Sequence, residues 1–203
     1  MIEKIDDFVF SHVCRQIKTW QANGLGDVHV SVNRSAHNFG NQRGRLDWLA
    51  YIREQQINPG LITLEITESV LMQRHAESGH LLKKLRQADV QIAVDDFGTG
   101  YSSLSYLKEM DIDYLKIDRS FIRDLESDVD DRAIIEAITD MAKHLGIEVI
   151  AEGVETESQK DILQQIGCHW LQGYYFAKPM PVTEFEKFIL AAQTDAEQST
   201  QSG

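Results

Sequence analysis

The sequence predicts an α/β fold in which a mostly parallel sheet closes into a (β/α) barrel. Apolar strands alternate with amphipathic helices along the 203 residues, and each connection is long enough for a parallel crossover. A barrel gathers all its strand ends on one face, whereas a doubly wound open sheet gathers only those at its switch point. The barrel is favoured because every one of the predicted strands has a polar residue at or near its carboxyl end: Asn33, Glu65, Asp95 with Asp96, Lys116, Glu152 and Gln172.

The composition fits one soluble, cytoplasmic domain. No apolar run approaches the length of a membrane span, and the start of the chain lacks the features of a signal peptide. Cys14 and Cys168 are too few for a disulfide framework and are expected to be reduced and buried. The net charge of -12 argues against binding to a nucleic-acid duplex and makes metal cations the better expectation.

The first half of the chain predicts a leading helix and three strands. The apolar face of that helix is expected to hold Ile5, Phe8, Val9, His12, Val13, Ile17 and Trp20, with His12 as a core histidine. Strands are predicted over 27–33, 61–67 and 90–94, separated by helices near 46–57 and 81–88. Alternation in the second strand turns Glu65 toward the barrel axis.

The second half continues the alternation and adds sharper helix boundaries. A short helix is expected from about Ser102, and the apolar stripe over 133–145 predicts a helix that Gly146 ends. Further strands are predicted at 114–118, 147–151 and 170–172, and capping boxes at 156–159 and 183–186 would open the last two helices. The folded domain is expected to span 1–192, followed by a polar, disordered tail over 193–203.

The stretch from Asp95 to Gly100 concentrates the unusual chemistry. Adjacent carboxylates repel each other in a buried setting unless a cation shares them. Taken alone, the stretch is equally compatible with an Asx-turn that caps a helix at Ser102 or Ser103. The polar residues at the other strand ends favour a metal site.

Oxygen donors dominate this predicted site. Four carboxylates (Glu65, Asp95, Asp96 and Glu152) and the amide of Asn33 suit Mg²⁺ or Mn²⁺, and no histidine or cysteine joins them as zinc would prefer. Two such ions are compatible with phosphodiester hydrolysis by a bound water. Lys116 would then orient this water or balance charge in the transition state. Alternatively, Lys116 only pairs with the carboxylates and holds them together.

Six ordered motifs resemble those of the EAL family of bacterial cyclic-di-GMP phosphodiesterases, and the resemblance covers the chain from near residue 1 to about 190. They are Asn33, Glu65-Ile66-Thr67-Glu68-Ser69, the stretch 95–103, Leu115-Lys116-Ile117-Asp118, Ala151-Glu152-Gly153-Val154-Glu155 and the stretch 172–176. The resemblance implies a TIM-like (β/α) barrel, N-terminally incomplete here, and hydrolysis of cyclic di-GMP to linear pGpG with two Mg²⁺ or Mn²⁺ ions.

The same resemblance implies roles for individual residues. The metal ligands would be Asn33, Glu65, Asp95, Asp96 and Glu152. Lys116, Glu152, Asp95 and Asp96 would be catalytic, and Lys116 would position the hydrolytic water. Gln172 would bind substrate together with Lys116. Glu68 would hold the glycine-rich loop after Asp96, a loop that couples dimerisation to activity in this family, so a homodimer is a possible assembly.

This sequence departs from the family pattern in one respect. The signature Glu-Ala-Leu, whose glutamate is a metal ligand in the family, does not occur in these 203 residues. Two strands of an eight-stranded barrel are also missing, so the chain is expected to be a fragment or a shortened relative with open edges near 28–32 and Trp170. A longer parent protein would carry a sensor or GGDEF-type domain.

Two alternatives to an active enzyme follow. The first is a catalytically inactive module that binds cyclic di-GMP or a protein partner. The second is a dinucleotide-binding oxidoreductase, because Gly98-x-Gly100-x-x-Ser103 follows a strand and Asp118 comes twenty residues after Gly98. Asp95 and Asp96 count against the second reading, since they would place negative charge beside a pyrophosphate.

Overall fold

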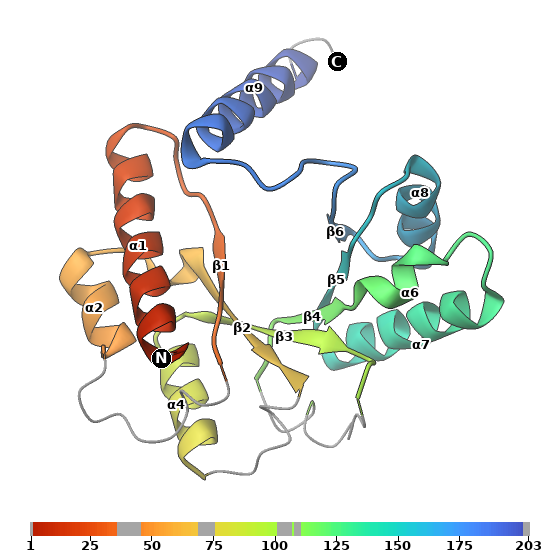
Figure 1. The fold of residues 1–203 in the computed structure, drawn as a ribbon, viewed down its shortest axis with the longest axis horizontal. Coiled ribbons are helices and arrows are strands. Elements are labelled where there is room, and N and C mark those ends of the chain that lie inside the picture. The colour runs from red at the N-terminus through yellow and green to blue at the C-terminus, as the bar shows by residue number, and fades with distance from the viewer. Residues whose placement is uncertain (1, 36–45, 69–75, 101–106, 108–110, 201–203) are drawn as a thin grey trace.

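Six parallel strands form one curled sheet in the computed structural model of this chain, which describes residues 2–35, 46–68, 76–100, 107 and 111–200 (Figure 1). Each strand pairs with its predecessor in the sequence, and the order never reverses. This is the arrangement of an incomplete α/β barrel, as predicted, and not of a doubly wound sheet. The strands are β1 (Val30–Asn33), β2 (Ile62–Thr67), β3 (Gln91–Phe97), β4 (Tyr114–Ile117), β5 (Glu148–Glu152) and β6 (Trp170–Gln172).

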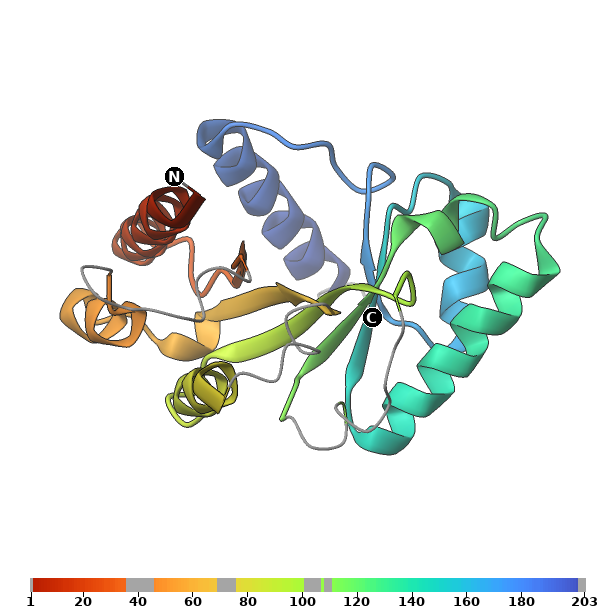
Figure 2. The ribbon, with the colours of Figure 1, turned by 60° about the horizontal axis from the view of Figure 1, so that its bottom comes forward.

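Helices cover the outer face of the sheet, as Figure 2 shows. Leu64, Ile66, Leu115 and Ile117 point outward from the strands and are fully buried in the core between the sheet and these helices. The helices preceding the last one are α1 (Ile2–Ala22), α2 (Trp48–Gln55), the 3₁₀ turn η2 (Pro59–Leu61), α4 (Ala76–Arg86), α6 (Arg119–Arg123), α7 (Val129–Leu145) and α8 (Glu157–Ile166).

Local signals explain where two of these helices begin and end. Gly146 ends α7 in the left-handed conformation, at a φ of 73°. The capping box between Thr156 and Gln159 opens α8, as predicted. The short helix expected from about Ser102 lies outside the described residues. Among the described residues, no helix combines the length and the apolar character that a membrane span needs.

The buried face of α1 agrees with the prediction at Ile17 and Trp20 but differs from it nearer the N-terminus, where Phe10 and Cys14 are buried. It consists of Phe10, Cys14, Ile17 and Trp20. Phe8 and His12 are exposed, so the expectation of a core histidine is wrong. The partner helix decides the face, because Phe10 stacks on Trp48 of α2 with ring centroids 3.7 Å apart. The apolar residues of this segment were numerous enough for either face to be the buried one.

The last helix, α9 (Val182–Thr200), corrects two predictions. It begins at Val182, and the carbonyl of Pro181 accepts the first helical N–H groups, so Thr183 lies inside the helix instead of capping it. It also continues to Thr200, into the segment 193–203 that was expected to be disordered. Alanine, glutamine and glutamate are strong helix formers, and extending an existing helix needs no new nucleation.

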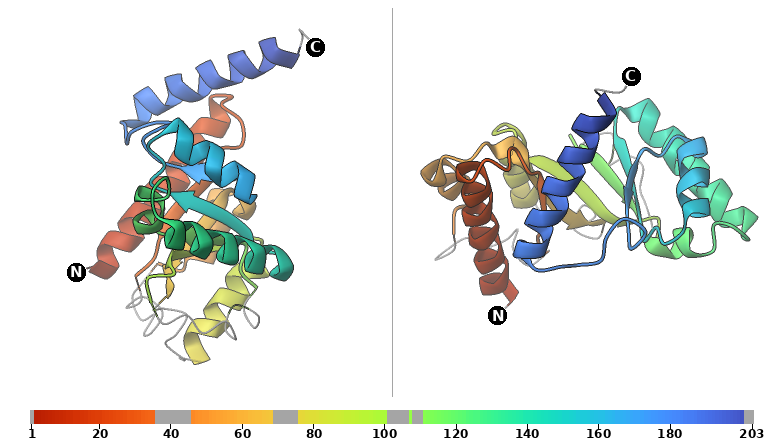
Figure 3. Two further views of the ribbon diagram at one scale, coloured as in Figure 1. Left: turned by 90° about the vertical axis from the view of Figure 1, so that its right-hand side faces the viewer. Right: turned by 90° about the horizontal axis from the view of Figure 1, so that it is seen from above.

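Helix α9 lies across the open side of the sheet, between the two edge strands β1 and β6 (Figure 1, Figure 3). Trp20 of α1 donates from Nε1 to Glu186 Oε1 at 3.0 Å, and its ring packs 5.4 Å from that of Phe185. Gln193 donates to the carbonyl of Leu25 at 3.3 Å. The helix that follows β6 is therefore fastened to the segments that lead into β1.

Candidate metal and phosphodiester site

Lys116 lies at the centre of three carboxylates that come from three strands. Its Nζ atom is 2.8 Å from Glu65 Oε2 in β2, 3.1 Å from Asp95 Oδ1 in β3 and 2.5 Å from Glu152 Oε1 in β5. We call these four residues the Lys116 cluster. The lysine side chain is only 4% exposed. The prediction that polar residues at the strand ends share one face is confirmed for these four residues.

A bulge in β3 places both aspartates at this end of the sheet. Val94 pairs with Leu115 and Phe97 pairs with Ile117, so two residues of β3 lie opposite Lys116 alone. Asp96 takes a left-handed conformation, with a φ of 56°. In a regular strand, neighbouring side chains point to opposite faces. The bulge lets Asp95 reach Lys116 while Asp96 stays exposed beside it.

Asn33 and Gln172 lie level with this cluster on the two edge strands. Asn33 is in register with Glu65, and Gln172 is in register with Glu152. Residues in register on parallel strands point to the same face of a sheet. Both are exposed. They therefore flank the Lys116 cluster at its rim.

Burial and neighbouring charges shift the protonation equilibria of the cluster. Burial alone would lower the pKa of Lys116, but the carboxylates of Glu65 and Glu152 outweigh it and raise this pKa, so the lysine stays charged. Burial raises the pKa of Glu152, opposed by Lys116. Burial and the charge of Asp95 raise the pKa of Asp96. Three carboxylates around one ammonium leave a net negative charge in the cluster, before Asp96 is added.

The donor atoms at this end of the sheet fit a hard divalent cation. They are carboxylate and amide oxygens, the ligands that Mg²⁺ and Mn²⁺ prefer. Within the described part of the chain, no three acidic, histidine or cysteine side chains are already gathered as a metal cluster. The acidic side chains converge on the ammonium of Lys116 instead.

Glu68 follows β2 and faces the glycine-rich loop. It is 8% exposed, and neither carboxylate oxygen has a hydrogen-bond partner among the described residues. A Cβ atom at Gly100 would lie 3.2 Å from Glu68 Oε1. Its carboxylate therefore lies close to the backbone at Gly100.

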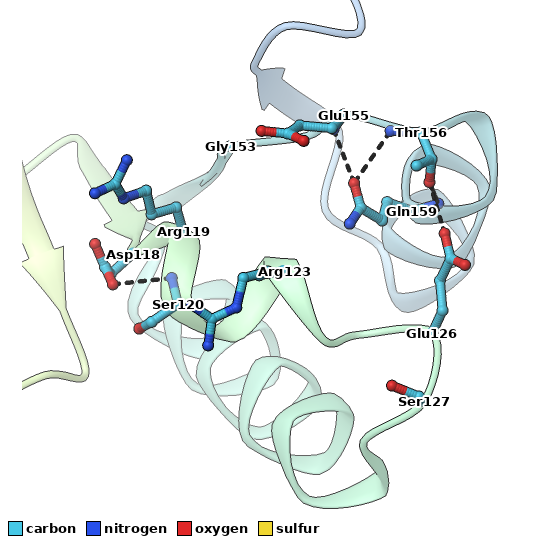
Figure 4. Close-up of a pocket in the computed structure, with 10 residues that line it drawn as sticks. All are labelled: Asp118, Arg119, Ser120, Arg123, Glu126, Ser127, Gly153, Glu155, Thr156 and Gln159. Atoms are coloured by element: carbon cyan, nitrogen blue, oxygen red, sulfur yellow. Dashed lines mark hydrogen bonds between the residues drawn. The ribbon is translucent and has the colours of Figure 1, made fainter.

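A hollow of about 860 Å³ lies beside the ends of β4 and β5 (Figure 4). Its lining combines the acidic residues Asp118, Glu126 and Glu155 with Arg119 and Arg123, two positive charges to which the sequence pattern gave no role. Their position directly after the strand that carries Lys116 was the available signal, because residues after barrel strands face the site. Gln159 holds the backbone of the segment between β5 and α8 in place, since its Oε1 accepts hydrogen bonds from the N–H groups of Glu155 and Thr156 at 2.8 and 3.1 Å (Figure 4).

Comparison with known proteins identifies relatives across nearly the whole chain. The family model of the EAL domain matches residues 1–179. The chain is 39% identical over 197 residues to the cyclic di-GMP phosphodiesterase NbdA of Pseudomonas aeruginosa, covering 97% of this chain and 25% of that protein. It is 41% identical over 186 residues to the bifunctional diguanylate cyclase/cyclic di-GMP phosphodiesterase MucR of the same species, covering 91% and 27%. The chain thus spans about a quarter of the length of these relatives.

Solved structures agree with this assignment. The c-di-GMP complex of the PaMucR phosphodiesterase superposes with a TM-score of 0.84 at 40% identity, over 91% of this chain and 74% of that one. The manganese and cyclic-di-GMP complex of BlrP1 from Klebsiella pneumoniae superposes with a TM-score of 0.74 at 29% identity, over 85% and 44%.

Proposed function

This chain belongs to the EAL domain family, and we propose from that premise that it carries the catalytic part of a cyclic di-GMP phosphodiesterase that produces linear pGpG. The observation that carries the proposal is the convergence of Glu65, Asp95 and Glu152 on Lys116 at the ends of parallel strands. Related structures hold cyclic di-GMP, one of them together with manganese.

Metal ligation in this proposal falls to the acidic residues and one amide. Glu65, Asp95, Asp96, Glu152 and Asn33 would hold two Mg²⁺ or Mn²⁺ ions. When bound, such ions supply a water of lowered pKa and neutralise charge on the phosphodiester. The oxygen-only donor set and its surplus negative charge support this assignment.

The remaining residues position the reactants. Lys116 would donate a hydrogen bond to the hydrolytic water and balance developing negative charge. Gln172 would contact the substrate from the rim. Arg119 would offer positive charge to an anionic dinucleotide, whereas the guanidinium of Arg123 is already paired with Asp124 at 3.0 Å. Glu68 would hold the loop after Asp96 by accepting its backbone N–H groups.

A second function is favoured by one specific observation. The Glu-Ala-Leu signature is absent from these 203 residues, so one expected carboxylate ligand is not supplied by them. The chain would then bind cyclic di-GMP or a protein partner without hydrolysing it. Homodimerisation, a sensor or GGDEF-type domain in the same protein and a cytoplasmic location belong to the same set of proposals. The bifunctional description of MucR, of which this chain covers 27%, supports a multidomain parent.

Two measurements together separate the two functions. The chain is incubated with cyclic di-GMP and Mn²⁺, and pGpG is quantified by chromatography. Binding of cyclic di-GMP is measured in parallel by calorimetry, with Mg²⁺ and with a chelator. Formation of pGpG that the chelator stops supports the phosphodiesterase. Binding without turnover in Mn²⁺ excludes the enzyme for this chain and supports the binding module.

A further inference from the structure

The carboxylates of the Lys116 cluster use the full hydrogen-bonding capacity of the lysine. An ammonium group has three N–H donors. The Nζ atom of Lys116 faces Glu65 at 2.8 Å, Asp95 at 3.1 Å and Glu152 at 2.5 Å. In this arrangement the lysine has no donor left for a water molecule or a phosphate oxygen. The positioning role of Lys116 therefore requires that it first release a carboxylate.

The same carboxylate oxygens are the ligands proposed for divalent cations. Asp95 and Glu152 have side chains that are 15% and 19% exposed, whereas that of Lys116 is 4% exposed. A cation arriving from the mouth meets these carboxylates before it meets the lysine. An oxygen lone pair given to a metal ion is no longer available to the ammonium, and two cations at such short range repel each other.

We propose that Lys116 is an internal counter-cation that competes with divalent metal ions for Glu65, Asp95 and Glu152, so that metal loading and release of the lysine are coupled. The inference rests on the proposed function, because it takes these carboxylates as metal ligands. Without metal, Lys116 neutralises carboxylates that would otherwise repel one another. With metal, its ammonium is free to donate to a water or to a substrate oxygen.

The coupling has a thermodynamic corollary. Linkage is reciprocal, so any anion that binds the released ammonium also strengthens metal binding. A phosphodiester substrate is such an anion. Lys116 thus keeps the metal affinity of the free site low and allows it to rise when substrate is present.

The test measures Mn²⁺ binding to the full chain without substrate, from the electron paramagnetic resonance signal of free Mn²⁺. Lys116→Met keeps the length of the side chain and removes its charge. Lys143→Met, at an exposed position in α7, is the matched control for net charge. We expect Lys116→Met to bind Mn²⁺ at least about tenfold more tightly than the unaltered chain, and Lys143→Met to stay within about twofold. Unchanged or weaker binding by a folded Lys116→Met overturns the proposal.

A second measurement uses the unaltered chain, in case Lys116→Met does not fold. The side-chain ammonium of Lys116 is followed by ¹⁵N nuclear magnetic resonance during a Mg²⁺ titration. We expect its signal to shift and its protons to exchange faster as Mg²⁺ saturates the site. A signal that stays unchanged while Mg²⁺ binds overturns the proposal.

Failure of this proposal is distinguishable from failure of the phosphodiesterase. Lysine-dependent Mn²⁺ affinity in a chain that makes no pGpG supports the competition and overturns the enzymatic function. Formation of pGpG together with equal Mn²⁺ affinities for the unaltered chain and Lys116→Met supports the phosphodiesterase and overturns the competition between Lys116 and metal ions.

Discussion

Gly173 packs directly against the backbone of Val154, and a Cβ atom at Gly173 would lie 2.1 Å from the Val154 carbonyl oxygen. Two hydrogen bonds hold this contact together. Val154 donates to the carbonyl of Gln172 and accepts from the N–H of Tyr175, both at 3.0 Å. The close approach of two backbones, which only glycine permits, therefore fastens the end of β6 to the loop after β5.

Gly173→Ala is expected to destabilise the fold by at least about 2 kcal/mol, because backbone atoms on both sides must move apart. Urea unfolding followed by circular dichroism measures the change. Gly60→Ala is the control, since a Cβ atom there meets its nearest neighbour at 3.4 Å. Equal unfolding midpoints for the two variants would contradict this account of Gly173.

Asp95→Asn is expected to abolish turnover of cyclic di-GMP. The substitution keeps the size of the side chain but removes the charge that would serve a metal ion, next to Lys116 at 3.1 Å. The readout is pGpG formation in Mn²⁺. Asp140→Asn, on the exposed face of α7, is the control and should retain the activity of the unaltered chain. Retained turnover in Asp95→Asn would remove the two-metal mechanism.

Trp20→Phe is expected to cost about 1–3 kcal/mol of folding free energy. The substitution removes the indole N–H that Glu186 accepts at 3.0 Å and reduces the packing against Phe185. Trp170→Phe is the matched control, because Trp170 is 55% exposed. Thermal unfolding compares the two variants. If both shift the midpoint equally, α9 does not fasten the two edges of the sheet.

Both cysteine thiols should resist alkylation in the folded chain. Burial raises the pKa of Cys14 to about 12 and that of Cys168 to about 11, from an ordinary value of 9.0, and both thiols are free. At about pH 8 the thiolate fraction of each is then far below that of an exposed cysteine. Iodoacetamide labelling, read by mass spectrometry, should appear only in denaturant. Rapid labelling of the folded chain would show that the thiols are accessible.

The same shifts predict a pH dependence of stability. A thiol whose pKa is raised by folding holds its proton more tightly in the folded state. The stabilisation that each buried, protonated thiol adds to the folded state is therefore complete below pH 9.0. It is lost as the pH rises through about 11 for Cys168 and about 12 for Cys14. In Cys168→Ala the free energy of unfolding should fall less steeply between pH 9.0 and about 11 than in the unaltered chain, as measured by urea unfolding at several pH values. An unaltered slope would assign the alkaline loss to other groups.

The sequence alone was sufficient to identify the four residues of the Lys116 cluster as candidates for one site. Glu65 and Lys116 each stand among apolar neighbours in a strand, and a buried charge needs a partner of opposite sign. The sequence was not sufficient to predict which of these side chains contact each other. The bulge that aims Asp95 at Lys116 arises from the pairing of Val94 and Phe97 with β4, which is long-range and leaves no periodic signal in the chain.

By itself the sequence determined the order of strands and helices, the parallel sheet and the polar residues at its strand ends, because these follow from local periodicity and burial of charge. Tertiary structure alone decided which face of α1 is buried, where α9 docks and how Asp95 and Asp96 share one strand end. Each of these depends on contacts between segments distant in the sequence. Stacking on Trp48, the bond from Trp20 to Glu186 and the register of β3 against β4 select one arrangement among several that the local pattern allows equally.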